Sequence, residues 1–254
     1  MSGPALAVDG LAKTFGGVRA VDGASFAVAE AEMLALIGPN GAGKSTCFNM
    51  IGGQLRPDCG RVSLAGRDVT GAPPRRLSRL GVGRTFQITE TFASMTVREN
   101  VQIALLAHQR RIWGVWRPVA GQAADAAERL LDQVGLAEQA ERAAGVLAYG
   151  DLKRLELAVA LANQPRVLLM DEPTAGMAPA ERAALMALVR RLASEQRLAV
   201  LFTEHDMDVV FGAADRILVL NRGRLIAEGN AAAIRADARV REVYLGGGLA
   251  MGPG

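Results

Sequence analysis

Cysteine and histidine are scarce in this chain, with 2 residues of each among 254. The two cysteines, Cys47 and Cys59, have no paired spacing, so the sequence contains no disulfide framework. We therefore expect a reducing compartment. Cys47 falls within a predicted helix, where an isolated cysteine most often packs as a small apolar residue.

Long apolar stretches and a secretory signal are also missing. No uncharged apolar run approaches the roughly 18 residues that a membrane-spanning helix needs. Residues 1–8 lack the charged start and apolar core of a secretory signal. We therefore expect that the chain does not cross a membrane by itself.

Charge of one sign is not in large excess. There are 29 basic and 26 acidic residues, for a formal net charge of +3, which is weak evidence for a nucleic-acid partner. Half of the residues are hydrophobic, which is enough for a sizeable core in one large α/β domain or two modest ones.

A glycine-rich segment between an apolar run and a predicted helix is the strongest functional motif. Residues 33–37 have the composition of a buried strand, and residues 47–51 that of the start of a helix. Between them the pattern Gly-x-x-x-x-Gly-Lys-Ser predicts a phosphate-binding loop, because its glycines let backbone N–H groups turn toward phosphate oxygens. The motif comprises Gly38, Pro39, Asn40, Gly41, Ala42, Gly43, Lys44, Ser45 and Thr46. In such a loop Lys44 reaches the β- and γ-phosphates and Ser45 binds Mg²⁺.

Two adjacent carboxylates follow another apolar run. Residues 167–170 are suited to a strand of a parallel sheet that is buried on both faces, and Asp171 and Glu172 come directly after them. Charge at the end of a buried strand must be solvated or paired. In a phosphate-loop fold the aspartate holds Mg²⁺ and the glutamate polarises an attacking water. The alternative is a solvated strand end without a role.

Three single residues remain ambiguous from local pattern. His205 lies just past the predicted strand 198–202, at the edge where α/β proteins bind ligands. Gln87 ends a mostly apolar segment, and this single residue predicts no function by itself. Phe15 stands among polar and glycine residues, either as an exposed ring that stacks on a base or as a ring packed under the strand layer.

The order of predicted elements indicates an α/β protein with a helical insertion. Residues 5–37 alternate short apolar runs with turn residues, which is typical of a strand-rich layer. From about 88 to 164 the pattern becomes helical, with a capping box at 96–99. Residues 109–118 interleave arginines with both tryptophans; they either meet a membrane surface or partner protein, or cover the helical lobe. The glycine-rich end, 246–254, is predicted to be disordered or loosely attached.

Taken in order, these motifs resemble those of the ATP-binding subunit of an ABC transporter, over nearly the whole chain. The matches are Phe15 for the adenine-stacking aromatic, 38–46 for Walker A, Gln87 for the Q-loop, 147–151 for the signature, 167–172 for Walker B and His205 for the switch histidine. The resemblance implies one α/β domain. It comprises a P-loop NTPase core with a mainly parallel sheet, an N-terminal antiparallel β layer and an inserted α-helical subdomain.

The resemblance also implies the limits of these parts and the roles of the site residues. The core with its β layer spans about 5–87 and 165–230, the helical signature subdomain about 88–164, and the C-terminal helix and tail 231–254. Glu172 is the implied general base, His205 contacts the γ-phosphate, Gln87 senses Mg²⁺ and nucleotide, and Asp171, Ser45 and Gln87 hold the metal. Two subunits, identical or related, meet head to tail around two ATP molecules. Each ATP lies between Walker A of one chain and the other chain's signature residues Ala148, Tyr149, Gly150 and Asp151.

Further partners follow from the same resemblance. An integral-membrane permease docks on the helical lobe near residues 88–97, and a periplasmic or extracellular substrate-binding protein acts indirectly. No nucleic acid is implied. The chain is expected at the cytoplasmic face of the plasma membrane as a peripheral subunit.

The finer resemblance is to importers of branched-chain amino acids. It rests on Leu-Ala-Tyr-Gly at 147–150, Pro-Thr-Ala-Gly-Met at 173–177, Glu-His-Asp-Met at 204–207 and Tyr-Leu-Gly at 244–246. Importers of urea or amides, and lipopolysaccharide exporters, are the transport alternatives.

Two positions depart from the general ABC pattern. The signature usually reads Leu-Ser-Gly-Gly-Gln, but Ala148 replaces the serine and Tyr149 the first glycine, so a hydroxyl toward the partner's γ-phosphate is missing. Gly150 and the helix N-terminus keep their backbone N–H groups. Met177 stands where the loop after Walker B usually has an aspartate, so the resemblance does not imply coupling between the two sites through that aspartate.

Other classes of protein explain less of the sequence. ABC ATPases of DNA repair insert a long coiled coil between Walker A and the signature, but here only about a hundred residues intervene, without sustained heptads. Translation-type members usually carry two cassettes, and no internal repeat occurs. A small-molecule kinase explains the phosphate loop and Asp171, but not Gly150 and His205.

Overall fold

The structure is a computed structural model that describes residues 3–85, 91–108 and 123–245. Gln87, the segment 109–118 and the tail 246–254 lie outside the described residues, so the predictions about them stay predictions. The strands are β1 (Leu6–Phe15), β2 (Val18–Val28), β3 (Met33–Ile37), β4 (Cys59–Leu64), β5 (Arg67–Asp68), β6 (Val82–Thr85), β7 (Val167–Asp171), β8 (Ala199–Thr203), β9 (Arg216–Asn221) and β10 (Arg224–Gly229). The helices are α1 (Lys44–Ile51), α2 (Pro74–Arg79), α3 (Val97–His108), α4 (Ala124–Val134), α5 (Tyr149–Leu161), α6 (Pro179–Gln196), α7 (Met207–Ala213), α8 (Ala231–Ala236) and α9 (Ala238–Leu245), with short 3-10 turns at Ala137–Gln139 and Ala144–Val146.

The larger sheet has the strand order β10-β9-β3-β8-β7-β6. Strands β9, β3, β8, β7 and β6 are parallel, and β10 pairs antiparallel with β9 at the edge. Parallel strands end at the same edge of the sheet, so the segments after β3, β7 and β8 share one edge. That edge carries the phosphate loop, the paired carboxylates and His205.

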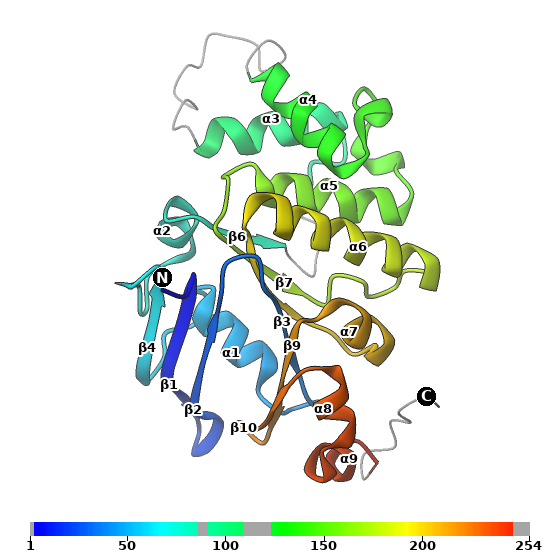
Figure 1. Ribbon diagram of the computed structural model, residues 1–254. Coiled ribbons are helices and arrows are strands. Elements are labelled where there is room, and N and C mark those ends of the chain that lie inside the picture. The colour runs from blue at the N-terminus through cyan, green and yellow to red at the C-terminus, as the bar shows by residue number, and fades with distance from the viewer. Residues whose placement is uncertain (1–2, 86–90, 109–122, 246–254) are drawn as a thin grey trace.

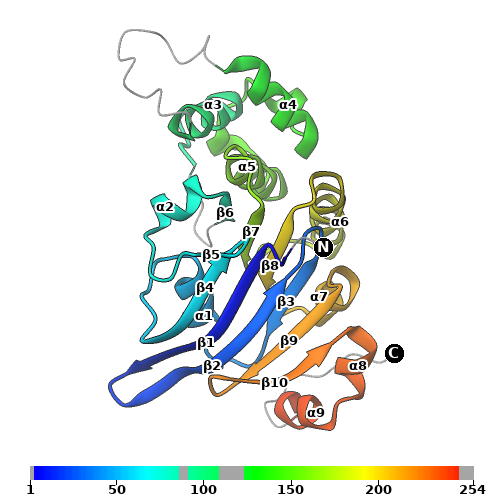
Figure 2. The ribbon, with the colours of Figure 1, turned by 60° about the vertical axis from the view of Figure 1, so that its left-hand side comes forward.

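The smaller sheet is antiparallel, with the order β2-β1-β4-β5, and lies in front of the parallel sheet in Figure 2. Helix α1 packs between the two sheets: Phe48 joins one core cluster with Leu34 and Leu36 of β3. The alternate residues of β3, such as Met33 and Ala35, face a second cluster with the helices on the other side. The predicted α/β fold with an N-terminal antiparallel layer is confirmed.

Helices α3, α4 and α5 form an arm at the top of the molecule in Figure 1. The predicted capping box begins it: the Thr96 N–H donates to Glu99 Oε2 at 2.8 Å, and the Glu99 N–H donates to Thr96 Oγ1 at 3.1 Å. Val97, Val101 and Leu105 are buried on one face, as predicted. Among the helices that the structure describes, none is long and apolar enough to span a bilayer.

Two elements have limits that their local sequence does not mark. Helix α2 ends at Arg79 and strand β6 starts at Val82, with only two residues between them. Strand β6 is short and contains a glycine, and it forms because its backbone pairs in parallel with β7. The signature forms the start of helix α5. Ala148 is the extended N-cap residue of α5, and Tyr149 already lies in the first helical turn.

Candidate functional site

The phosphate loop joins β3 to α1 and is packed closely against distant segments. Gly38 and Gly43 have φ values of 152° and 103°, which side-chain-bearing residues rarely adopt. A Cβ atom on Gly38 would lie 2.1 Å from the carbonyl oxygen of Leu220 in β9, and one on Gly43 would lie 2.1 Å from that of Ala20 in β2. Only glycine fits at either position.

Lys44 is folded back over its own loop. Its Nζ donates to the carbonyl oxygens of Gly38 at 2.7 Å and Pro39 at 3.2 Å, and the side chain is buried. Burial lowers the pKa of Lys44, whereas the nearby carboxylates of Glu172 and Asp171 oppose that shift. The phosphate loop and the paired carboxylates therefore lie within electrostatic reach of one another, as their motifs predict.

The rest of the loop faces solvent in part. Asn40 and Gly41 form its exposed tip, Ala42 is buried, and the exposed Ser45 and half-buried Thr46 lie in the first turn of α1. Cys47 is fully buried, and burial raises the pKa of its thiol to about 12. Its expected role as a small apolar core residue is therefore confirmed.

Asp171 is held by its neighbours at the end of β7. Thr203 at the end of β8 donates its hydroxyl to Asp171 Oδ1 at 2.6 Å, and an Arg84 nitrogen lies 3.8 Å from Oδ2. The Asp171 carboxylate and the exposed Ser45 hydroxyl are oxygen donors of the kind that Mg²⁺ prefers, so these residues fit that ion. Thr203 and Arg84 were not predicted from the sequence.

Glu172 and His205 face each other past the ends of β7 and β8. Glu172 Oε1 and His205 Nε2 lie 2.7 Å apart, and their side chains are 23% and 43% exposed, so water reaches the pair. The backbone of Glu172 is left-handed, with a φ of 49°, which costs a residue with a side chain about 1–2 kcal/mol. Thr203 fixes this conformation, because the Glu172 N–H donates to its carbonyl at 3.2 Å and to its hydroxyl at 3.1 Å.

Glu204 is the main residue that sequence reasoning missed. Its carboxylate is buried, with 4% of the residue exposed. Oε1 accepts from the N–H and the hydroxyl of Thr174 at 2.9 and 2.6 Å, and Oε2 accepts from the N–H of His205 at 3.2 Å. The available signal was its position right after a buried strand, which is the same signal that identified Asp171.

The signature residues lie at the N-terminus of α5. Tyr149 is 45% exposed, Gly150 is buried and Asp151 is half-buried. The Tyr149 hydroxyl donates to the carbonyl oxygen of Ala175, 3.0 Å away in the loop after Glu172. In the described part of the chain, no hydrogen bond or ion pair joins residues 148–151 to the phosphate loop.

Phe15 lies at the end of β1 with its ring exposed. The side chain is 49% exposed, and Lys13 Nζ lies 5.7 Å from the ring centroid. The alternative of a ring packed beneath the strand layer is therefore wrong. Stacking on a base stays a prediction.

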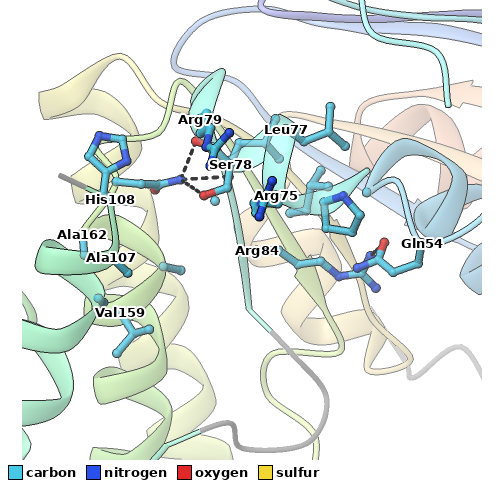
Figure 3. Close-up of a pocket in the computed structure, with 18 residues that line it drawn as sticks. Gln54, Arg75, Leu77, Ser78, Arg79, Arg84, Ala107, His108, Val159 and Ala162 are labelled. Carbon is cyan, nitrogen blue, oxygen red and sulfur yellow. Dashed lines mark hydrogen bonds between the residues drawn. The ribbon is translucent and has the colours of Figure 1, made fainter. Parts of the chain in front are cut away.

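A groove of about 730 Å³ lies away from the phosphate loop, between α2 and β6 on one side and α3 and α5 on the other. Figure 3 shows its labelled side chains. Asn163 fixes one wall, since its Nδ2 donates to the backbone and hydroxyl oxygens of Ser78 at 3.1 and 3.2 Å. The basic lining residues are Arg75, Arg79, Arg84 and His108, and no acidic residue lines the groove within the described ranges.

This fold and this edge of the sheet define an ATP-binding cassette. The family model described as "ABC transporter" matches residues 21–175, and a second one, "Branched-chain amino acid ATP-binding cassette transporter", matches residues 224–250. The chain therefore belongs to the ABC transporter family, as an ATP-binding subunit that hydrolyses ATP.

Individual relatives agree with this assignment. The chain is 42% identical to the high-affinity branched-chain amino acid transport ATP-binding protein LivG of Salmonella typhimurium, over 97% of this chain and 99% of LivG. Among solved structures, the ADP conformation of the cassette MJ1267 matches with a TM-score of 0.87 and 33% identity, over 96% of this chain and 99% of that one. The dimeric, post-hydrolysis structure of the cassette MJ0796 with ADP and Pi matches with a TM-score of 0.74 and 25% identity, over 89% and 98%.

Proposed function

We propose that this chain powers an importer of branched-chain amino acids. The observation that carries the proposal is the 42% identity to LivG over nearly the full length of both chains. The match to the branched-chain family model supports it, because that match covers β10, α8 and α9, outside the general nucleotide motifs. Importers of urea or amides and lipopolysaccharide exporters are the alternatives, and a transport assay separates them.

The proposed chemistry uses the pair at the ends of β7 and β8. Glu172 accepts a proton from the water that attacks the γ-phosphorus, and a positioned general base of this kind contributes about 10²- to 10⁴-fold. His205, 2.7 Å from Glu172, contacts a γ-phosphate oxygen and orients the carboxylate. Lys44 exchanges the carbonyls of Gly38 and Pro39 for phosphate oxygens.

The nucleotide and its metal are proposed to bind along the same edge. Residues 38–46 hold the phosphates through backbone N–H groups and the N-terminus of α1. Ser45 and Asp171, with Gln87, would hold Mg²⁺, which when bound neutralises phosphate charge. Phe15 would stack on the adenine.

Two chains are proposed to complete two ATP sites. Ala148, Tyr149, Gly150 and Asp151 would face the nucleotide held by a partner's phosphate loop, with α5 presenting its N-terminal N–H groups. The absence of a described contact between the signature and its own phosphate loop supports this arrangement.

The proposed parts of the chain are a core at about 5–87 and 165–230, a helical subdomain at about 88–164 and a C-terminal part at 231–254.

The groove beside the helical arm is the proposed docking surface for a permease. Its lining is basic at Arg75, Arg79, Arg84 and His108, and His108 ends α3, the helix that begins at Val97. Docking there would hold the subunit at the cytoplasmic face of the membrane, with an external substrate-binding protein acting through the permease.

The test is transport by the assembled complex. The chain is purified with the membrane proteins that bind it, placed in lipid vesicles and supplied with ATP, labelled leucine and an external binding protein. We expect ATP-dependent leucine uptake. Glu172→Gln should bind Mg-ATP with near-normal affinity but lose hydrolysis by about 10²- to 10⁴-fold, and uptake with it. Uptake of urea or amides in place of leucine, or export of lipopolysaccharide, would overturn the proposed substrate. Unchanged turnover of Glu172→Gln would remove Glu172 from the base role.

A further inference from the structure

The signature and the loop after Glu172, which both depart from the general ABC pattern, lie next to each other in space. Tyr149, in the signature, donates its hydroxyl to the carbonyl oxygen of Ala175 at 3.0 Å. A Cβ atom on Gly176 would lie 3.5 Å from the Tyr149 ring, so ring and loop are in ordinary contact. Met177 is buried, and its Cε lies 3.8 Å from where a Cβ atom on Gly150 would be. The unusual signature thus contacts the unusual loop within one chain.

The loop between Glu172 and α6 has two other anchors. Thr174 is held by the buried carboxylate of Glu204, and the Met177 carbonyl accepts from Arg182 Nε at 2.7 Å. Glu204 follows β8 and Arg182 lies in α6, so both belong to the nucleotide-binding core. Of these three anchors, the one at Tyr149 comes from α5, the helix that carries the signature.

The loop is also bonded directly to the catalytic pair. The Ala175 N–H donates to the carbonyl oxygen of Glu172 at 3.2 Å. Glu204 holds Thr174 with one carboxylate oxygen and the backbone of His205 with the other. A shift of Ala175 therefore reaches Glu172 through one hydrogen bond, and reaches His205 through the neighbouring residue Thr174.

The proton of the Tyr149 hydroxyl is used in this arrangement. A tyrosine hydroxyl carries one proton, and Tyr149 donates it to the Ala175 carbonyl oxygen, so Tyr149 has no proton left to donate to a partner's phosphate. Tyr149 therefore does not replace the missing signature serine as a phosphate ligand. It acts on its own chain.

We propose that Tyr149 is a positioning residue that ties the signature turn of each chain to Glu172 of that same chain. The inference rests on the proposed function, in which ATP at the partner's phosphate loop contacts this signature. When the two chains close, the ATP held by the partner contacts the Gly150 turn and moves α5. Tyr149 transmits that movement through Ala175 to Glu172, which acts on the ATP held by its own chain. The two sites are thereby coupled without the usual aspartate, since residues 173–178 of the loop contain none.

The test removes only the hydroxyl, by Tyr149→Phe, in the transporter assembled with its permease in lipid. ATP hydrolysis is measured against ATP concentration. The parent should show a Hill coefficient between one and two, because two sites interact. The variant should lose about two- to tenfold in kcat, the factor expected for one neutral hydrogen bond, and its Hill coefficient should fall toward one. Affinity of the isolated chain for Mg-ATP should stay within about twofold, because Tyr149 does not touch the nucleotide of its own chain.

A control and a stability measurement separate positioning from a merely structural role. Val146→Ala changes an exposed side chain, 63% exposed, just ahead of the same segment and should leave kcat and the Hill coefficient unchanged. Val146→Ala should melt within about 2 °C of the parent, as surface substitutions do, and Tyr149→Phe within about 6 °C, the shift expected for the loss of one neutral hydrogen bond. A Tyr149→Phe complex with the parent's kcat and Hill coefficient would overturn the inference, as would a parent whose Hill coefficient is one. A parent complex that hydrolyses no ATP would instead overturn the proposed function on which the inference rests.

Discussion

Replacing Glu204 tests whether a buried carboxylate holds the catalytic edge together. Glu204→Ala leaves three donors without their acceptor: the N–H and hydroxyl of Thr174 and the N–H of His205. An unsatisfied buried donor costs about 1–3 kcal/mol, and the hydroxyl can rotate away, so we expect a total loss of about 3–5 kcal/mol. In a domain of this size each kcal/mol shifts the melting temperature by about 2–4 °C, which predicts a fall of about 6–20 °C.

The isosteric change Glu204→Gln should keep the hydrogen bonds from Thr174 and lose the one from His205. The amide oxygen can keep both bonds from Thr174, but the amide nitrogen then meets the N–H of His205 as donor against donor. We expect the loss of one charged hydrogen bond, about 1.5–3 kcal/mol, or about 3–12 °C. Hydrolysis should fall less than in Glu172→Gln, because Glu204 fixes the backbone of His205 and takes no proton from water.

The assay is thermal unfolding of the purified chain, followed by its ATP hydrolysis in the assembled transporter. Glu195→Ala is the matched control, because it removes a carboxylate that is 55% exposed and pairs with Arg191 at the surface of α6. Such surface pairs contribute about 0–1 kcal/mol, so the control should melt within about 4 °C of the parent. If Glu204→Ala melted as high as this control, the network around Glu204 would not hold the edge, and the reasoning would be refuted.

Two further predictions concern the phosphate loop and the proposed base contact. Gly43→Ala should lower the melting temperature much more than Gly41→Ala. A Cβ atom on Gly43 would lie 2.1 Å from the Ala20 carbonyl oxygen, whereas one on Gly41 would meet nothing within 4 Å. Equal melting temperatures would contradict the packing of the loop. Phe15→Ala should weaken Mg-ATP binding by about five- to a hundredfold, the loss expected for one base–aromatic stack of about 1–3 kcal/mol, with little change in stability because the ring is exposed. Unchanged affinity in an equilibrium titration would show that Phe15 does not stack on the base.

The sequence was informative where one segment determines its own structure. The run of apolar residues before Gly38 and the run before Asp171 predicted β3 and β7, since parallel strands that are buried on both faces are apolar on both faces. The capping box at 96–99 predicted the start of α3 because its two hydrogen bonds lie within four residues.

The sequence was less informative where a structure depends on a partner far along the chain. Strand β6 has two buried residues at its start and a half-buried Arg84, and its identity as a strand comes from pairing with β7. Glu204 looks like any carboxylate after a strand until the fold places Thr174 beside it. Tyr149 and Ala175 are separated by helix α5 and strand β7, and no local pattern indicates that they meet.

The phosphate loop itself illustrates the same limit. Its motif predicted what it binds, but its position is fixed by residues near the far end of the chain. The Gly223 N–H, in the turn between β9 and β10, donates to the Ala42 carbonyl at 2.9 Å. Tyr244 of α9 is buried, and its hydroxyl accepts from the N–H of Gly38; burial raises the pKa of this phenol. The region that matches the branched-chain family model therefore contacts the phosphate loop, which is the most general motif in the chain. We expect substitutions in α9 that remove the Tyr244 contact to change the affinity for ATP.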